Sequence, residues 1–168
     1  MANRQGGKSC GSKPTGMVTV MYFGRRREQY FREADDEYIK RIGGYSKIQL
    51  VELTQSKLPQ EPAEAHIAAA LEREAETLRT ALGRLPRGTR TVALRIDGDT
   101  VRSDCFAELV NDNVCFIIGG SHGLSESVVT DRSISLGRLT LPHELARVVL
   151  LEQIYRGFTI RSGGKYHK

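Results

Sequence analysis

The sequence predicts an α/β fold built on an open, largely parallel sheet. Short apolar runs alternate with longer helical stretches along the chain, which is the order that produces parallel strands. The run Val114–Ile118 has no polar interruption and suits a strand buried on both faces. It ends at Gly119 and Gly120, and a second short run, residues 134–136, ends at Gly137. Because open α/β sheets bind ligands at the carboxyl ends of their strands, these two glycine bends predict a ligand site.

Apolar runs place five strands, at residues 18–23, 48–53, 91–96, 114–118 and 134–136. The first is rich in β-branched and aromatic residues, and the second alternates apolar with polar positions. The triplet Asp97-Gly98-Asp99 follows the third strand and is expected to be the turn that ends it. Near the end of the chain, residues 158–160 are apolar and are expected to be extended.

Helical periodicity and capping signals place five helices, at residues 28–42, 63–82, 104–110, 125–130 and 143–156. The first carries one apolar stripe, and the second consists mainly of strong helix formers. Ser103 and Ser125 are the expected N-caps of the two short helices. Pro142 suits the first turn of the last helix, in which Glu152 and Arg156 are spaced for an ion pair.

The length and composition favour a single folded domain. The chain has 168 residues, of which 17–168 form the expected domain and 1–16 an expected disordered leader or added extension. No apolar run approaches the roughly 20 residues that cross a bilayer, and no signal peptide is recognisable, so we expect a cytoplasmic protein without membrane contact. Three cysteines without a C-x-x-C pair indicate neither a disulfide framework nor a metal site, and Cys115 is expected to be buried.

Basic residues occur at two places that suit a polyanionic partner. The formal net charge of +5 is compatible with RNA binding but does not require it. Arg25, Arg26 and Arg27 follow the first strand, where they form either a solvated turn or a phosphate contact. The basic segment 161–168 ends the chain and is either a frayed end or a flexible clamp on a phosphate-bearing substrate.

Three motifs carry a resemblance to a known family. They are F-I-I-G-G-S-H-G-L at residues 116–124, S-L-G-R-L-T-L-P-H-E-L-A-R-V-V-L-L-E-Q-I-Y-R at residues 135–156 and K-Y-H-K at residues 165–168. Over residues 18–168 the chain resembles the RlmH family of SPOUT RNA methyltransferases, which methylate N3 of a pseudouridine in 23S ribosomal RNA. The resemblance implies a C-terminal trefoil knot, a homodimer, S-adenosylmethionine as methyl donor and the assembled ribosome as substrate. Segment 103–114 is several residues shorter than is usual in the family, which affects one wall of the expected pocket.

The same resemblance implies a cofactor site made from the end of the third strand and the two glycine loops. Leucines in these segments provide apolar walls for the adenosine, and no metal ligand is expected. The expected cofactor-binding residues are Leu94, Arg95, Gly119, Gly120, Gly137, Arg138, Leu139, Thr140, Leu141 and Pro142.

The acceptor N3 carries a proton that must leave, which requires a general base or a cation that stabilises the deprotonated base. The catalytic candidates are His143, Arg147, Tyr166 and His167. His143 and Arg147 lie one helical turn apart on a shared face, although His143 also suits a structural role at the helix start. Tyr166 and His167 combine a stacking ring with a basic group, and the tail of one subunit is expected to complete the pocket of the other.

Two other functions fit the sequence less closely. A SPOUT methyltransferase acting on another RNA, for example on a ribose hydroxyl of transfer RNA, fits the motifs, but the chain is short and shows no added RNA-binding domain. A non-catalytic nucleotide- or RNA-binding α/β protein would keep the fold without the chemistry. Binding of S-adenosylmethionine, measured by calorimetry, distinguishes this last alternative.

Overall fold

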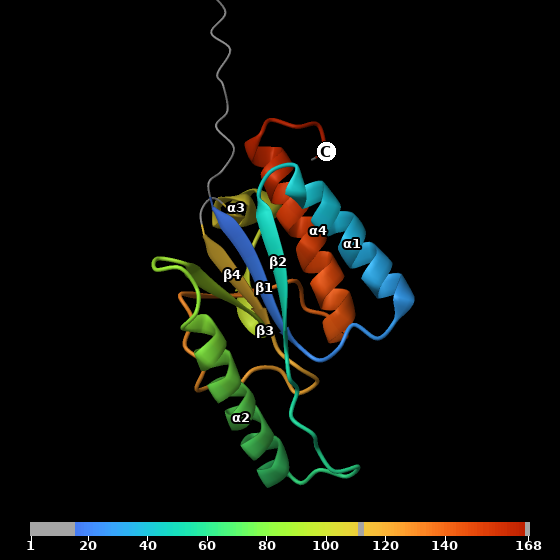
Figure 1. Cartoon of the computed structure of the whole chain (residues 1–168), viewed down its shortest axis with the longest axis vertical. Coiled ribbons are helices and arrows are strands. Elements are labelled where there is room, and N and C mark those ends of the chain that lie inside the picture. The colour runs from blue at the N-terminus through green and yellow to red at the C-terminus, as the bar shows by residue number, and fades with distance from the viewer. Residues whose placement is uncertain (1–15, 111–112, 167–168) are drawn as a thin grey trace, which may run out of the picture.

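A computed structural model describes residues 16–110 and 113–166 of the chain. Most of the expected leader, residues 1–15, therefore lies outside the described residues. Parallel strands form one sheet in the order β2-β1-β4-β3-β5, which confirms the predicted α/β class (Figure 1). The strands are β1 Met17–Phe23, β2 Lys47–Leu53, β3 Arg90–Thr100, β4 Val114–Ile118 and β5 Arg132–Ser135. The helices are α1 Gln29–Gly43, α2 Glu64–Leu82, α3 Ser103–Ala107, the 3₁₀ helix η1 Glu108–Val110 and α4 His143–Arg161.

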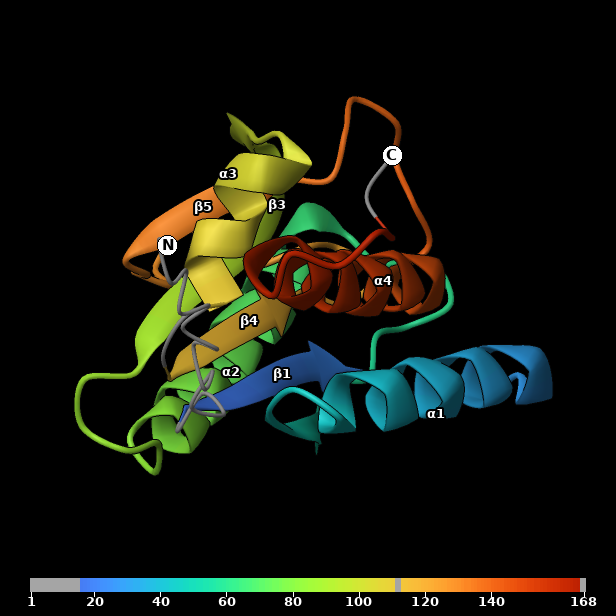
Figure 2. The same cartoon turned by 90° about the horizontal axis from the view of Figure 1, so that it is seen from above.

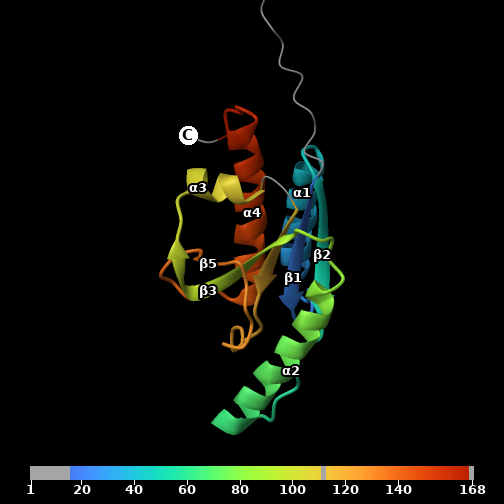
Figure 3. The same cartoon turned by 90° about the vertical axis from the view of Figure 1, so that its left-hand side faces the viewer.

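Helices cover both faces of the sheet, with α1, α3 and α4 on one side and α2 on the other (Figures 2 and 3). The alternation of side chains along each strand divides the core accordingly. Val20, Tyr22 and Phe116 belong to the cluster that packs against α1, α3 and α4. Met21 and Ile117 belong to the cluster that packs against α2. The two apolar cores therefore fix which strand positions face which helix layer.

The central strand β4 is buried at every position, so the prediction of a strand covered on both faces is confirmed. Cys115 within it is fully buried, as expected. Burial raises the pKa of the Cys115 thiol to about 12, because the thiolate would lose its hydration. Cys115 is therefore a small core residue without thiolate chemistry.

The third strand is longer than predicted, because Asp97-Gly98-Asp99 does not end it. β3 continues to Thr100, and its register against β5 shifts between Leu94 and Asp99, which both pair with Ile134. A Cβ on Gly98 would lie 2.6 Å from the backbone carbon of Ile134. Gly98 is thus required by a close approach of two strands rather than by a turn.

Two predicted short-helix features are wrong. Residues 125–130 form no helix, because the Ser125 hydroxyl accepts the Ser127 N–H at 3.1 Å and closes a local turn instead. Ser103 lies inside α3 rather than capping it, and its hydroxyl donates to Gln153 Oε1 at 3.0 Å. Both serine hydroxyls therefore form hydrogen bonds other than the N-cap bonds that the sequence predicted.

The last helix is also longer than predicted, since residues 158–160 are helical and not extended. α4 runs to Arg161 and buries Phe158 in the core. Gly157 lets the helix approach α3 and η1 closely, because a Cβ there would lie 3.0 Å from Val110 Cγ2. Among the described ranges, no helix combines the length and apolarity of a membrane span, and no cluster of metal-binding side chains occurs.

Candidate active site

A cavity of about 510 Å³ lies at the carboxyl end of β4, where the sequence predicted a ligand site. Its wall is built from residues 94–96 within β3, where the register against β5 shifts, the bend after β4, the loop that follows β5 and the first turn of α4. Strand ends and loops from four separate parts of the chain thus enclose one space, which is the arrangement that open α/β sheets use for ligands.

The bend after β4 is so tight that only glycine fits at its first position. A Cβ on Gly119 would lie 2.4 Å from the carbonyl carbon and oxygen of Gly123. Gly123 has a φ of 78°, and it closes the bend by forming a bridge with Gly120. The bend therefore presents bare backbone to the cavity, which suits close contact with a ligand.

The second glycine bend opens the opposite wall of the cavity. Gly137 has a φ of 147°, and a Cβ placed on it would meet no atom within 4 Å. Leu139, two residues later, lines the cavity and is 81% exposed, so its large apolar side chain is accessible to a ligand. Backbone amides and apolar surface are the two features that an adenosine with an amino-acid tail requires, so the lining fits S-adenosylmethionine.

Most of the residues expected to bind cofactor meet in this cavity. Arg138 is exposed and lies outside the lining, although its neighbours on both sides belong to it. The expected residues that line the cavity are Leu94, Arg95, Gly119, Gly120, Gly137, Leu139, Thr140, Leu141 and Pro142.

Arg95 holds the wall of the cavity in place through its guanidinium group. Its Nη2 donates to the Ser125 carbonyl at 2.8 Å and its Nη1 to the Leu124 carbonyl at 3.3 Å. Glu126 lies 3.6 Å from the same group but is almost fully exposed, so it adds little. The side chain of Arg95 therefore fixes the segment that follows the β4 bend.

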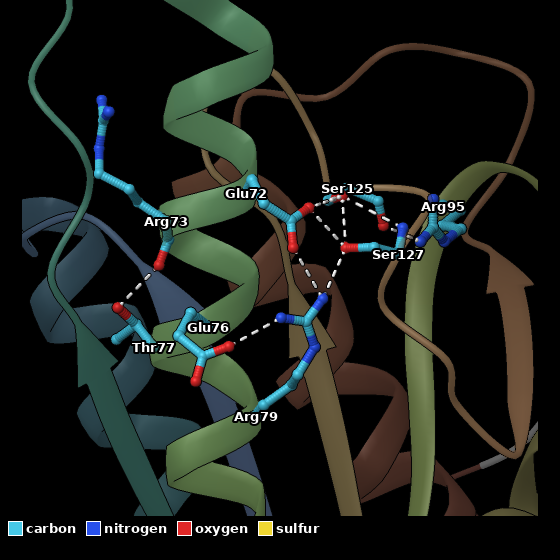
Figure 4. Close-up of polar contacts among 8 residues, drawn as sticks. All are labelled: Glu72, Arg73, Glu76, Thr77, Arg79, Arg95, Ser125 and Ser127. Atoms are coloured by element: carbon cyan, nitrogen blue, oxygen red, sulfur yellow. Dashed lines mark hydrogen bonds and ion pairs between the residues drawn. The ribbon is translucent and has the colours of Figure 1, made fainter.

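A polar network on α2 secures the same segment from the other side (Figure 4). Glu72 accepts hydrogen bonds from Ser127 at 2.8 Å and Ser125 at 3.3 Å, and Arg79 donates to Ser127 at 2.8 Å. Arg79 also pairs with Glu72 at 2.9 Å and so fixes the acceptor. The sequence showed a charged helix here, but not that its side chains reach a loop about 50 residues away.

His143 lies in the cavity wall at the start of α4. Its Nε2 is 3.3 Å from the position that a Cβ of Gly24 would occupy, so the imidazole packs against the bend after β1. Pro142 is the N-cap of α4, and no side chain caps this helix. The half-buried imidazole is thus free to face a ligand rather than satisfy the helix end.

Comparison with known proteins identifies the family. Residues 17–167 match the family described as "Predicted SPOUT methyltransferase". The chain belongs to the SPOUT methyltransferase family.

Relatives within this group share most of the chain. A "Ribosomal RNA large subunit methyltransferase H" of Pelotomaculum thermopropionicum is 41% identical, over 89% of this chain and 98% of that protein. A "Putative ribosomal RNA large subunit methyltransferase H" of Methanococcus maripaludis is 39% identical, over 90% of this chain and 99% of that protein. The crystal structure of the A. aeolicus TrmH/SpoU tRNA modifying enzyme superimposes with a TM-score of 0.55 over 90% of this chain and 79% of that chain. Its sequence identity of 14% supports the fold alone.

In this SPOUT methyltransferase, Arg147 was expected to lie beside His143 in the site, but it does not line the cavity. Its side chain is fully buried, with Nε donating to Asp35 Oδ2 at 2.9 Å and its guanidinium carbon 4.6 Å from the centre of the Tyr22 ring. Burial raises the pKa of Asp35, and the Arg147 guanidinium opposes that rise. Asp35 on α1 pairs with Arg147 in the core, so the guanidinium lies outside the lining of the cavity, and a catalytic role of Arg147 stays a prediction.

Tyr166, the tail candidate that the structure describes, lies away from the cavity of its own chain. Tyr166 donates to Glu152 Oε1 at 3.1 Å and stacks edge-on against Tyr155. Glu152 is about 14 Å along α4 from His143, by the rise of a helix. The expected Glu152–Arg156 ion pair is confirmed at 2.7 Å. His167 lies outside the described residues, so its role stays a prediction.

Proposed function

We propose that this protein transfers a methyl group from S-adenosylmethionine to N3 of a pseudouridine in the RNA of the large ribosomal subunit. The observation that carries the proposal is the cavity shared by two glycine bends, Gly119–Gly123 after β4 and Gly137 after β5, the two strands that flank β3 in the sheet. The relatives named as large-subunit methyltransferases support the same RNA, since they match nearly the whole chain.

The residues that would hold the cofactor provide two kinds of contact, with backbone groups and with apolar side chains. Gly119 and Gly120 offer backbone groups for the polar ends, and Leu94, Leu139 and Leu141 provide the walls for the adenine. When bound, S-adenosylmethionine supplies an activated methyl group on a sulfonium. Much of the rate then comes from holding donor and acceptor close and in line, which requires a rigid wall of the kind that Arg95 fixes.

For the acceptor, His143 is the group best placed to act on the N3 proton. It lines the cavity and packs against the bend after β1. An imidazole there accepts the N3 proton or hydrogen-bonds the deprotonated base. Arg147 contributes indirectly, because its pair with Asp35 fixes the helix on which His143 lies.

We further propose that two copies act together and that the C-terminal segment forms a trefoil knot. Tyr166 lies along α4, away from its own cavity, which agrees with a tail that serves the partner subunit. Deletion of residues 165–168 is then expected to abolish methyl transfer while cofactor binding persists. Full activity of the shortened protein would refute this arrangement.

The experiment that tests the proposal is methylation with tritiated S-adenosylmethionine of assembled 70S ribosomes, free large subunits and transfer RNA. Label in large-subunit RNA, mapped to N3 of one pseudouridine and strongest in 70S ribosomes, is expected. Label in transfer RNA instead would favour another RNA substrate. The absence of both methyl transfer and cofactor heat in calorimetry would favour a non-catalytic RNA-binding protein.

A further inference from the structure

A second cleft of about 1080 Å³ adjoins the active-site cavity. Its lining comes from the bends after β1, β2 and β4, whereas the active-site cavity lies beside the end of β4, the middle of β3 and the loop after β5. The two spaces meet at β4, the middle strand of the sheet, and Ser121 lines both. A molecule that fills the second cleft therefore reaches the place where cofactor chemistry would occur.

The second cleft has a strongly cationic wall. Arg25, Arg27 and Lys57 line it with exposed side chains that form no ion pair with any residue of 16–110 or 113–166. Arg26 between the first two turns away and pairs with Asp36 at 3.1 Å. Glu52 is the one acidic residue in this lining. Two arginines of the triplet thus remain available to an anionic ligand, which favours the phosphate contact over the solvated turn.

A chain of hydrogen bonds marks the boundary between the two spaces. The Gln55 side-chain amide donates to Ser121 Oγ at 2.9 Å, and Ser121 Oγ lies 3.0 Å from His122 Nδ1. The hydroxyl either donates to Nδ1 or accepts from it, according to the tautomer of the imidazole, and in both cases the second ring nitrogen of the exposed His122 is available to a ligand. Gln55 also approaches the cofactor bend, since a Cβ on Gly120 would lie 2.9 Å from its Nε2.

We propose that the second cleft binds the RNA strand that flanks the target nucleotide. Arg25, Arg27 and Lys57 contact its phosphates, and the Gln55–Ser121–His122 chain positions the target base as it passes into the active-site cavity. This inference rests on the proposed RNA methyltransferase function and names the surface that receives its substrate. A single strand requires both a cationic track and groups that reach a splayed-out base, and the cleft offers both.

The cationic track is tested with the double variant Arg25→Gln/Lys57→Gln and the charge-matched control Arg84→Gln/Arg87→Gln. The control residues lie between α2 and β3, at the amino ends of the parallel strands, whereas the cleft lies at their carboxyl ends. Affinity for a short fluorescein-labelled single-stranded RNA is measured by anisotropy over a range of salt concentrations. Each lost phosphate contact is expected to reduce the salt slope by about 0.7, so the double variant should lose about 1.4 and the control should match wild type. Calorimetry with S-adenosylmethionine should give the same affinity in all three proteins.

These outcomes separate the cleft from the proposed function. Equal salt slopes in the double variant and the wild type would contradict RNA binding in the second cleft, whether or not the wild type methylates RNA. A reduced slope in the double variant, together with a wild type that transfers no methyl group to any RNA, would support RNA binding in the cleft and reject the methyltransferase proposal. If the control variant loses as much affinity for the RNA as the double variant, the attraction is non-specific. That result would also contradict RNA binding in the second cleft.

The boundary chain needs its own variant, because Ser121 acts through position rather than charge. Ser121→Ala removes the hydrogen bonds of this hydroxyl to Gln55 and His122, and is expected to lower kcat roughly tenfold while the salt slope of RNA binding is unchanged. Ser121→Thr keeps the hydroxyl and should restore most of kcat. Unchanged kcat in Ser121→Ala would show that the chain does not position the base.

Discussion

Asp35 and Arg147 form a fully buried ion pair that joins α1 to α4, with Arg147 Nη2 2.9 Å from Asp35 Oδ2. The Oδ1 atom of Asp35 has no hydrogen-bond partner among the described residues. Removing one partner of such a pair leaves an uncompensated charge in the core. Asp35→Asn is therefore expected to lower the free energy of unfolding by about 3–5 kcal/mol, measured by urea denaturation. A loss below about 1 kcal/mol, typical of an exposed pair, would contradict the buried-pair account.

Replacing both partners together separates a packing role of Arg147 from a catalytic one. An Asp35→Leu/Arg147→Met protein fills a similar volume without charge, and its stability is expected to be near that of wild type. If Arg147 only holds α4, this protein should keep methyl transfer. Wild-type stability with activity lost would show that the guanidinium itself takes part in the reaction.

Gly119 is the residue whose substitution should damage the cofactor site most directly. A Cβ there would lie 2.4 Å from the Gly123 carbonyl, so Gly119→Ala must open the bend. S-adenosylmethionine binding, measured by calorimetry, is expected to weaken at least about tenfold. The matched control is Gly43→Ala at the end of α1, where a Cβ meets no atom within 4 Å and should stabilise the helix by up to about 1 kcal/mol. Equal cofactor affinity in both variants would contradict the assignment.

Arg95 is expected to act on the cofactor through the wall that it fixes. Arg95→Met removes the hydrogen bonds to the Leu124 and Ser125 carbonyls, each worth about 1 kcal/mol. The dissociation constant for S-adenosylmethionine should rise roughly tenfold. Glu126→Gln, which removes only an exposed pair at 3.6 Å, should leave it unchanged. An equal effect of the two substitutions would rule out the carbonyl contacts as the cause.

Glu74 on α2 gives the fold a pH dependence of known sign. Burial raises the pKa of its carboxyl above the ordinary 4.5, although the Ser56 N–H, at 2.7 Å, opposes the rise. Between the unfolded and folded pKa values the native protein holds a proton that the unfolded chain has released, so stability falls as pH rises through that window. In urea denaturation at several pH values, the stability of wild type minus that of Glu74→Gln should decrease from acid to neutral pH. A difference that increases with pH would contradict the raised pKa.

The sequence predicted the parts of the fold that depend on local pattern. The continuous apolar run of β4 implied a strand buried on both faces, and the two glycine bends implied a ligand site between them. The strand is confirmed and a cavity lies between the two bends, because continuous apolarity and glycine geometry are properties of short segments. The cavity brings together residues from the middle of β3, the end of β4 and the loop after β5.

Several features that the sequence did not reveal depend on contacts between distant segments. Gly98 resembled a turn residue, but its role depends on Ile134 in a neighbouring strand. Arg147 resembled a site residue, but its position depends on Asp35, 112 residues earlier in the chain. The attachment of Ser127 to Glu72 likewise spans 55 residues. No periodicity or spacing within a segment reports such pairings.

The claim on which the function depends is that the glycine bends at Gly119 and Gly137 enclose the methyl donor. The direct measurement is a crystal structure of the protein soaked with S-adenosylmethionine. We expect density for the donor between the β4 bend and residues 137–142, with its methyl group directed toward His143 and the boundary with the second cleft. A cavity that stays vacant at saturating donor, or that the protein's own side chains fill, would contradict the account.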